Sequence, residues 1–288
     1  YTLFFSIPER RDMPIPATVS VQFTLNQDGY DIPLDFRESA DKIHSLTVNG
    51  TAAEIRFENE HILLPAGLLQ EGENIADIEI TAGETSLNRN PEFLFTLFVP
   101  DRARTAFPLF DQPDLKAVYE LTLEIPSDWE AISNAALNSI VHKDSTKVLE
   151  FSPSDRFSSY LFSFVAGRFE SVTRTINGVE MTMLHRESDP GKVERNLDNI
   201  FELHSASLAW LEEYTGIDQP FQKFDFALIP SFPYGGMEHV GAIQYRASSL
   251  LLDEDPSDSQ LLGRASLIAH ETAHMWFGNL VTMKWFND

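Results

Sequence analysis

One stretch near the end of the sequence, Leu261–Phe277 (LLGRASLIAHETAHMWF), restricts the possible folds most. Apolar residues recur within it at spacings of three and four, which predicts one helix with a packed side. Asp258 or Ser259 can cap its start, and Gly278 followed by Asn279 can end it. We therefore expect a helix that is anchored in a core.

Two histidines four residues apart lie on the same face of a helix, so the imidazoles of His270 and His274 can both reach one ion. Glu271 completes the pattern H-E-x-x-H, in which two neutral imidazoles bind zinc. Zinc lowers the pKa of a bound water toward ~7, and Glu271 can take its proton to give a hydroxide that attacks a carbonyl. The alternative is a polar patch on a solvated helix, which the apolar flanks do not favour.

The overall composition narrows the function classes. A length of 288 residues suggests two domains, and a formal net charge of −23 argues against nucleic acid or an anionic membrane as partner. No apolar run approaches the ~18–20 residues of a membrane span, as expected of a soluble protein. With no cysteine, both the cytoplasm and a periplasmic or secreted location stay open. The start at Tyr1 suggests a trimmed or mature chain.

The first part of the chain reads as strands. Val19–Leu25, Ile75–Ile80 and Tyr119–Ile125 alternate apolar and polar residues, which is the period of a half-buried strand. Turn signals such as Asn49-Gly50 separate these runs. Many short strands predict a β-sandwich or saddle-shaped β domain over residues 1–172, a structural or binding module. Its expected last strand lies in the apolar run 160–169.

The pattern changes in the second part, which we expect to form another domain over residues 173–288. Apolar residues at helical spacing over 193–211, followed by Gly216, predict a helix with a glycine stop. The strands expected in this part are 179–185, 224–229 and 241–246. The fold class is therefore α+β, with two domains and the candidate metal helix in the second.

A second chemical signal is the sequence Gly235-Gly236-Met237-Glu238-His239, which lies between two expected strands. Glycines let a backbone approach another chain closely, and a carboxylate beside them can hold a cationic group. Taken alone, the pattern favours a plain turn with an exposed Glu238.

Taken together, these segments resemble the aminopeptidase N-type zinc aminopeptidases, the gluzincin family that includes leukotriene hydrolase. The resemblance covers essentially the whole chain. Its specific part is a glycine-Met-Glu motif at this distance before H-E-x-x-H, because H-E-x-x-H alone is shared by many metalloproteases. The segments that carry it are ARTAFPLFDQPDLKA (103–117), SYLFSFVAGRFE (159–170), GGMEHVGAIQYR (235–246) and HETAHMWFGNLVTMKWFND (270–288).

The resemblance implies a role for each matching position. His270 and His274 would be zinc ligands, and Glu271 the general base. Glu238 would bind the free α-amino group of a peptide, which limits cleavage to the first residue. The other positions expected to bind the peptide substrate are Gly235, Gly236, Met237, Gly241 and Ala242.

Two of these stretches have a structural role in that interpretation. Gly235 and Gly236 are expected to present backbone groups to the peptide. The stretch Gly241–Gln244 is expected to pair with the peptide as an added strand.

The sequence also departs from the family pattern. The family's third zinc ligand is a Glu nineteen residues after the second histidine, which falls five residues past Asp288, and its oxyanion-stabilising tyrosine lies further on. We therefore expect the chain to stop within the thermolysin-like catalytic domain and to be inactive by itself. The family's exopeptidase motif usually ends in Asn, where this chain has His239.

The sequence thus predicts a zinc-dependent aminopeptidase that hydrolyses the first peptide bond of peptides with a free N-terminus. Two alternatives stay open: an epoxide hydrolase on the same zinc site, and a non-catalytic peptide-binding homologue that has lost its metal. The preferred first residue, the physiological substrate and the oligomeric state are not readable from the sequence.

Overall fold

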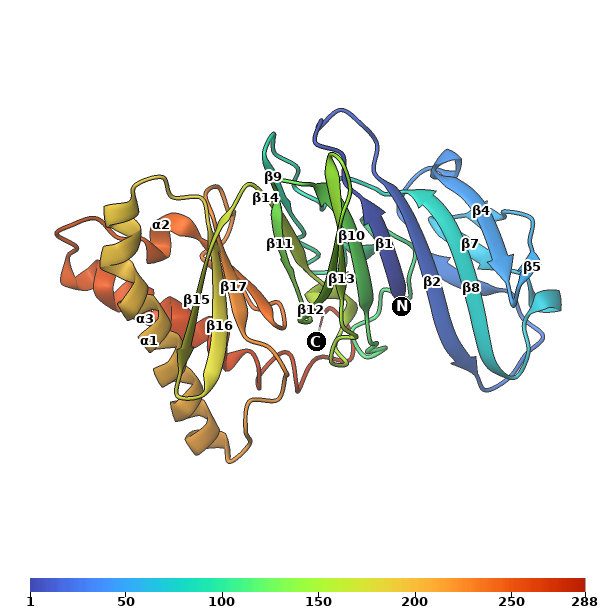
Figure 1. Ribbon diagram of the computed structural model, residues 1–288. Coiled ribbons are helices and arrows are strands. Elements are labelled where there is room, and N and C mark those ends of the chain that lie inside the picture. The colour runs from blue at the N-terminus through green and yellow to red at the C-terminus, as the bar shows by residue number, and fades with distance from the viewer. Residues whose placement is uncertain (288) are drawn as a thin grey trace. The chain divides into compact units, whose positions relative to one another are not determined.

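The computed structural model describes residues 1–287, and the chain forms two compact units (Figure 1). The first unit contains residues 1–129 and 137–162 together with the last residues from Lys284. The second unit contains Glu130–Ala136 and Ser163–Met283. The mixed α+β class predicted from the sequence is confirmed. The predicted bounds, 1–172 and 173–288, stay a prediction, and Asp288 lies outside the described residues.

The first unit is built on an eight-stranded sheet with the order β12-β13-β10-β1-β2-β8-β4-β5. Side chains along β2 and β8 alternate between buried and exposed, so one face of this sheet packs and the other meets solvent. The strands are β1 (Thr2–Ser6), β2 (Pro16–Leu25), β4 (Ile43–Val48), β5 (Thr51–Ala52), β8 (Gly72–Thr81), β10 (Glu120–Pro126), β12 (Leu137–His142) and β13 (Thr146–Phe151).

A smaller sheet and short helices complete the first unit. The small sheet has the order β3-β7-β6, and stacked rings of Tyr119, Phe157 and Phe162 lie in the core. The remaining elements are β3 (Ile32–Asp35), β6 (Phe57–Glu58), β7 (His61–Leu64), β9 (Phe93–Phe95) and the 3₁₀ turns Ala40–Lys42, Ala66–Leu68, Ala103–Thr105 and Ser159–Leu161.

The predicted strand 160–169 is wrong in part. Ser159–Leu161 forms a 3₁₀ turn, and the strand of this run, β14, is limited to Phe164–Gly167. Ser159 Oγ donates to Asp111 Oδ1 at 2.7 Å, and Ser158 Oγ donates to the carbonyl of Pro113 at 2.6 Å. Both bonds reach residues 45 and 48 positions earlier in the chain, so the apolar run does not reveal them.

The second unit has a five-stranded sheet with the order β15-β16-β17-β19-β18, and its helices lie on one side of that sheet (Figure 1). Strands β11 and β14 form a separate antiparallel pair. The elements are β11 (Glu130–Ser133), β15 (Glu170–Ile176), β16 (Val179–His185), α1 (Pro190–Thr215), β17 (Asp225–Ile229), β18 (Gly236–Met237), β19 (Ala242–Arg246), α2 (Ala247–Leu250) and α3 (Asp258–Ala273).

Helix α1 contains the helix predicted over 193–211 and ends where the sequence predicted. Asp189 caps its start by accepting from Gly191 N at 2.9 Å, and Pro190 occupies the first helical position, where its missing N–H costs nothing. Gly216 closes the helix with φ +67°, a left-handed conformation that glycine adopts without strain.

Helix α3 is shifted relative to the prediction of 261–277. Its cap is Ser257, not Asp258 or Ser259, because Ser257 and Gln260 form a reciprocal capping box. The regular helix ends at Ala273, and His274 is the C-cap residue. The chain then continues through a tight turn, where Trp276 N donates to the carbonyl of Ala273 at 3.1 Å.

A buried histidine joins α1 to the sheet. His204 Nδ1 lies 2.8 Å from the carbonyl of Ile200, and His204 Nε2 lies 3.0 Å from the hydroxyl of Tyr245 on β19. The ring stacks on Phe226 of β17. A neutral imidazole satisfies both contacts, with Nδ1–H donating and Nε2 accepting.

Two further features of the described residues bear on function. None of the helices is long and apolar enough to cross a membrane.

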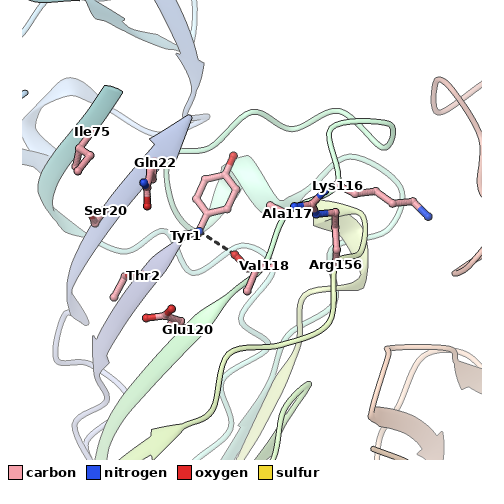
Figure 2. A pocket seen from close by; sticks show the side chains of 10 residues that line it. All are labelled: Tyr1, Thr2, Ser20, Gln22, Ile75, Lys116, Ala117, Val118, Glu120 and Arg156. Carbon is pink, nitrogen blue, oxygen red and sulfur yellow. Dashed lines mark hydrogen bonds between the residues drawn. The ribbon is translucent and has the colours of Figure 1, made fainter. Parts of the chain in front are cut away.

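A hollow of about 360 Å³ lies in the first unit, and its charged lining side chains, Lys116, Glu120 and Arg156, carry both signs (Figure 2). This lining favours neither an anionic nor a cationic ligand.

We expect the second unit to lose stability in acid through His204. Burial lowers the pKa of His204 from 6.5 to about 4, so the unfolded chain binds the proton first. The contribution of neutral His204 to the free energy of unfolding is complete above pH 6.5 and is lost as the pH falls toward 4. The loss between pH 7 and pH 5 is about 2 kcal/mol. Denaturant unfolding at pH 7 and pH 5 measures this effect. Between these pH values, the free energy of unfolding should fall by about 2 kcal/mol less in His204→Gln than in the wild type. The matched control is His142→Gln, at an exposed position on β12, which should keep the wild-type pH dependence.

Candidate active site

Strand β18 carries the glycine-Met-Glu motif at the edge of the five-stranded sheet. Gly236 pairs with Tyr245 and Met237 with Gln244, in antiparallel register. Gly235 and Gly236 are half-buried, Met237 is buried, and Glu238 follows directly after the strand. β18 is therefore one of the two edges of this sheet, with β15 at the other, and an extended segment can pair along such an edge.

The prediction that Gly241–Gln244 offers an edge strand is wrong. Strand β19 lies between β17 and β18, and Ala242, Ile243 and Gln244 are fully buried. The N–H of Ala242 is also occupied, because it donates to the carbonyl of His239 at 3.1 Å. Gly241 has φ +65° and forms a turn against Asn134, where an added Cβ would lie 2.4 Å from the Asn134 carbonyl oxygen. Gly241 is thus required for a turn that leads into a buried strand.

Gly236 allows β18 to approach α3 closely. A Cβ at this position would lie 2.5 Å from Glu271 Oε1 and 2.6 Å from Glu271 Cγ. The backbone of β18 therefore rests directly on the side chain of Glu271 from α3. The neighbouring Gly235 is less constrained, because its nearest atom would be Leu267 Cδ1 at 3.2 Å, the end of a flexible side chain.

His270 of α3 and His274, the C-cap residue of that helix, meet as two zinc ligands would. His270 Nε2 and His274 Nε2 are 3.2 Å apart, and the rings stand at 89° to each other. Two nitrogens bound to a tetrahedral zinc at ~2.0–2.1 Å lie about 3.3–3.4 Å apart, so this spacing fits such an ion. The ring of His270 is exposed, while the side chain of His274 is half-buried.

The turn after α3 determines the tautomer of His274. His274 Nδ1 lies 3.0 Å from the carbonyl of Phe277 and must carry the proton to bond with it. Nε2 is then left with a lone pair directed toward His270, as a ligand requires. Gly278 has φ +138°, and a Cβ there would approach His274 Nδ1 to 2.9 Å, so only glycine leaves the ring in place.

Glu271 is a buried carboxyl group with its charge disfavoured. Its Oε2 is buried with no hydrogen-bond partner among the described residues. Burial, and secondly the charge of Glu238, raise the pKa of Glu271 to about 8. A divalent cation at the two imidazoles would offset both effects, so Glu271 also fits a metal site.

Glu238 lies beside this group. Its Oε1 is 3.9 Å from His274 Nδ1, and possible ligand atoms of Glu238, Glu271 and His274 all lie within 4.8 Å of one another. The side chain of Glu238 is only 15% exposed. The turn interpretation, with a solvated Glu238, is therefore wrong because the carboxylate is held against α3.

His239 is buried rather than directed to solvent. The residue is 0% exposed, and neither ring nitrogen has a hydrogen-bond partner among the described residues. Burial lowers the pKa of His239 to about 3, so the ring is neutral. At this position the chain therefore presents no charge to a ligand.

The sequence did not reveal the side chains that hold Glu238 in place. Asn279 Nδ2 donates to the carbonyl of Glu238 at 2.7 Å, and Asn134 Nδ2 donates to the carbonyl of Val240 at 2.8 Å. Lys223 Nζ donates to the carbonyl of Gly241 at 2.7 Å. Asn279 had been assigned only to the end of a helix, and Lys223 and Asn134 are distant in sequence. No local pattern indicates such contacts.

Comparison with known proteins gives a consistent result along the chain. Residues 200–288 match the family described as "Peptidase family M1 domain", and residues 83–161 match "Peptidase M1 N-terminal domain". "Aminopeptidase N" of Streptomyces lividans is 35% identical over 94% of this chain, and "Probable aminopeptidase 1" of Sulfurisphaera tokodaii is 32% identical over 92%. "Puromycin-sensitive aminopeptidase" of Caenorhabditis elegans is 38% identical over 67% of the chain. The chain covers 32%, 34% and 20% of these three relatives, about a third or less of their length.

We expect Gly236→Ala to disturb this site far more than Gly235→Ala. The new Cβ at position 236 must displace Glu271, which costs about 1–3 kcal/mol as overpacking does in a core. The Cβ at position 235 meets only the flexible end of Leu267, so the free energy of unfolding of Gly235→Ala should stay within about 1 kcal/mol of the wild-type value. Denaturant unfolding of the two variants measures the difference. Equal stabilities would contradict the close approach of Gly236 to Glu271.

Proposed function

Because this chain belongs to peptidase family M1, we propose that it is part of a zinc-dependent aminopeptidase. The proposed reaction is hydrolysis of the first peptide bond of peptides that have a free N-terminus. The observation that carries the proposal is the meeting of two imidazoles, a buried carboxyl group and a second carboxylate around one point of the second unit.

His270 and His274 are proposed to hold the ion. Their Nε2 atoms are spaced as two ligands of one tetrahedral zinc, and the Phe277 carbonyl orients the His274 ring. When bound, zinc supplies a Lewis acid that polarises a carbonyl and activates water. The chain's own contribution is to bring both ring nitrogens together on one face.

Glu271 is proposed to move the proton. It follows His270 directly and is held against Gly236, so its position relative to the two imidazoles is determined by packing. A general base must lie within hydrogen-bond reach of the proton that it takes. In its ionised form Glu271 accepts a proton from the attacking water and then passes it to the leaving amine.

Glu238 is proposed to bind the α-ammonium group of the substrate. Its carboxylate is 15% exposed and lies beside the proposed metal ligands, so a charged amine bound there places the first peptide bond near the ion. An internal peptide bond offers no such charge and would leave Glu238 without a partner. The edge strand β18 supplies backbone groups that can pair with the peptide.

The test is zinc content and hydrolysis of amino-acid amides, measured on the intact natural protein that carries this chain. We expect one bound zinc and cleavage of unblocked but not N-acetylated substrates. His270→Ala should lose zinc, because one of its ligands is gone. Glu271→Gln should keep zinc but lose about 10²–10⁴-fold in kcat, the usual contribution of a general base. The control Glu213→Gln, at an exposed position on α1, should match the wild type.

Glu238→Gln separates the exopeptidase from other activities on the same zinc. It should keep the zinc and lose the preference for a free amine, because the amide carries no charge to pair with an ammonium group. Cleavage of N-acetylated substrates by the wild type would contradict amine recognition. A protein that binds no zinc and cleaves nothing would instead be a peptide-binding homologue, and zinc-dependent opening of an epoxide without peptide cleavage would indicate a hydrolase of another class.

We expect the 288-residue chain to bind zinc more weakly than the intact natural protein and to be inactive or nearly so. Residues 1–288 supply two imidazoles, and the third ligand that the family resemblance implies lies outside them. Losing a whole ligand should cost more affinity than the ~10–100-fold caused by losing an outer partner. Competition with a zinc-binding dye measures both affinities. Equal affinities would show that another residue of this chain, such as Glu238, completes the site.

A further inference from the structure

The loop that carries Glu238 has every backbone carbonyl from residue 238 to residue 241 hydrogen-bonded. The carbonyl of His239 accepts from Ala242 N within the loop. The other three accept from side chains of different segments, which we call the carbonyl clamp: Asn134, Lys223 and Asn279. A loop held in this way is more rigid than one solvated by water, because each carbonyl must break a buried bond to move.

Two members of the carbonyl clamp attach the loop to the framework of the second unit. Lys223 Nζ pairs with Asp225 Oδ2 at 2.8 Å and also donates to the carbonyl of Ser133. Asp225 Oδ1 in turn accepts from Thr182 N at 2.7 Å. Asn134 uses its carboxamide oxygen to accept from Ser163 N at 2.7 Å.

Asn279 differs because it joins the loop to the metal helix. Its Nδ2 donates to the Glu238 carbonyl at 2.7 Å, and its backbone N–H donates to the His274 carbonyl at 2.9 Å. One residue therefore connects the main chain of the amine-binding carboxylate to that of a metal-binding imidazole. Asn279 is 0% exposed, so water does not compete for these bonds.

We propose that Asn279 is the positioning residue for N-terminal recognition: it sets the distance between the Glu238 carboxylate and the ion that His274 binds. This inference rests on the proposed aminopeptidase function and adds a residue to it. The distance matters because the ammonium group and the first carbonyl of a peptide are separated by a fixed number of bonds. A carboxylate misplaced by about 1 Å is expected to lose much of the rate, since catalysis depends on close positioning.

The test uses a double-mutant cycle in the intact natural protein, with Leu-amide as the unblocked substrate and N-acetyl-Leu-amide as the blocked one. Asn279→Leu removes the amide donor and keeps a side chain of similar shape. We expect it to lower kcat/KM for the unblocked substrate about 10–100-fold, mainly through KM, with zinc still bound at one per chain. In the Glu238→Gln background, Asn279→Leu should lower kcat/KM for the unblocked substrate by less than about twofold. The reason is that the effects of two residues that act through one group do not add.

The control is Asn196→Ala, which removes another buried asparagine from the second unit. Asn196 Nδ2 also donates to a backbone carbonyl, that of Leu252 at 2.9 Å, and its Oδ1 accepts from Arg264 of α3 at 2.7 Å. We expect it to lower thermal stability while leaving the KM for the unblocked substrate unchanged. Should Asn279→Leu fail to fold, Asn279→Ser takes its place in the same cycle.

The outcomes divide clearly. The positioning role would be overturned if Asn279→Leu lowered kcat/KM equally in the wild-type and Glu238→Gln backgrounds. It would also be overturned if Asn279→Leu lost its zinc. Either result would leave Asn279 a purely structural role. If the wild type shows no preference for the unblocked substrate, the proposed function fails instead. In that case hydrogen exchange of the backbone amides in residues 237–242 still tests the tether. Faster exchange in Asn279→Leu than in Asn196→Ala supports the tether, and equal exchange contradicts it.

Discussion

The contact on which the candidate site depends is the close approach of Gly236 to Glu271. It joins an edge strand to a helix that follows about twenty residues later, and it leaves no room for a Cβ between them. Because packed interiors deform little, this contact also determines where His270 and His274 lie relative to Glu238. The two motifs that looked separate in the sequence are thus one packed unit, with the glycine of one against the carboxylate of the other.

Several parts of this arrangement followed from local rules. The helix at α1, its stop at Gly216, and the placement of two histidines on one helical face depend on periodicity and capping, which a sequence displays directly. Other parts depended on competition between neighbours. The sequence offered Asp258 or Ser259 as the cap of α3, and the capping box with Gln260 selects the preceding Ser257 instead. In the apolar run, by contrast, Ser158 and Ser159 bond to Pro113 and Asp111, which lie 45 and 48 positions earlier.

The contacts that no local rule reveals are those between distant segments. Asn279 reaches the carbonyl of a residue 41 positions earlier, and Asn134 reaches one 106 positions later. Their side chains are ordinary polar residues in the sequence, and only the fold shows which carbonyl each one satisfies. The order of the five strands, which buries β19 and leaves β18 at the edge, is also a property of the topology. This is why the sequence placed the edge of the sheet at Gly241–Gln244, which lies in an interior strand.

Ending the regular helix at His274 has a chemical consequence. In a continuing helix, the residues after His274 would direct their carbonyls along the axis, away from the imidazole of that residue. Here the chain turns, Phe277 places its carbonyl on His274 Nδ1, and Trp276 Nε1 secures the turn by donating to the carbonyl of Ile217 at 3.1 Å. The same turn brings Asn279 to Glu238. A helix that ran on to residue 277, as the periodicity alone predicts, would orient neither the His274 ring nor the loop that carries Glu238, so the early end of α3 is part of what builds the candidate site.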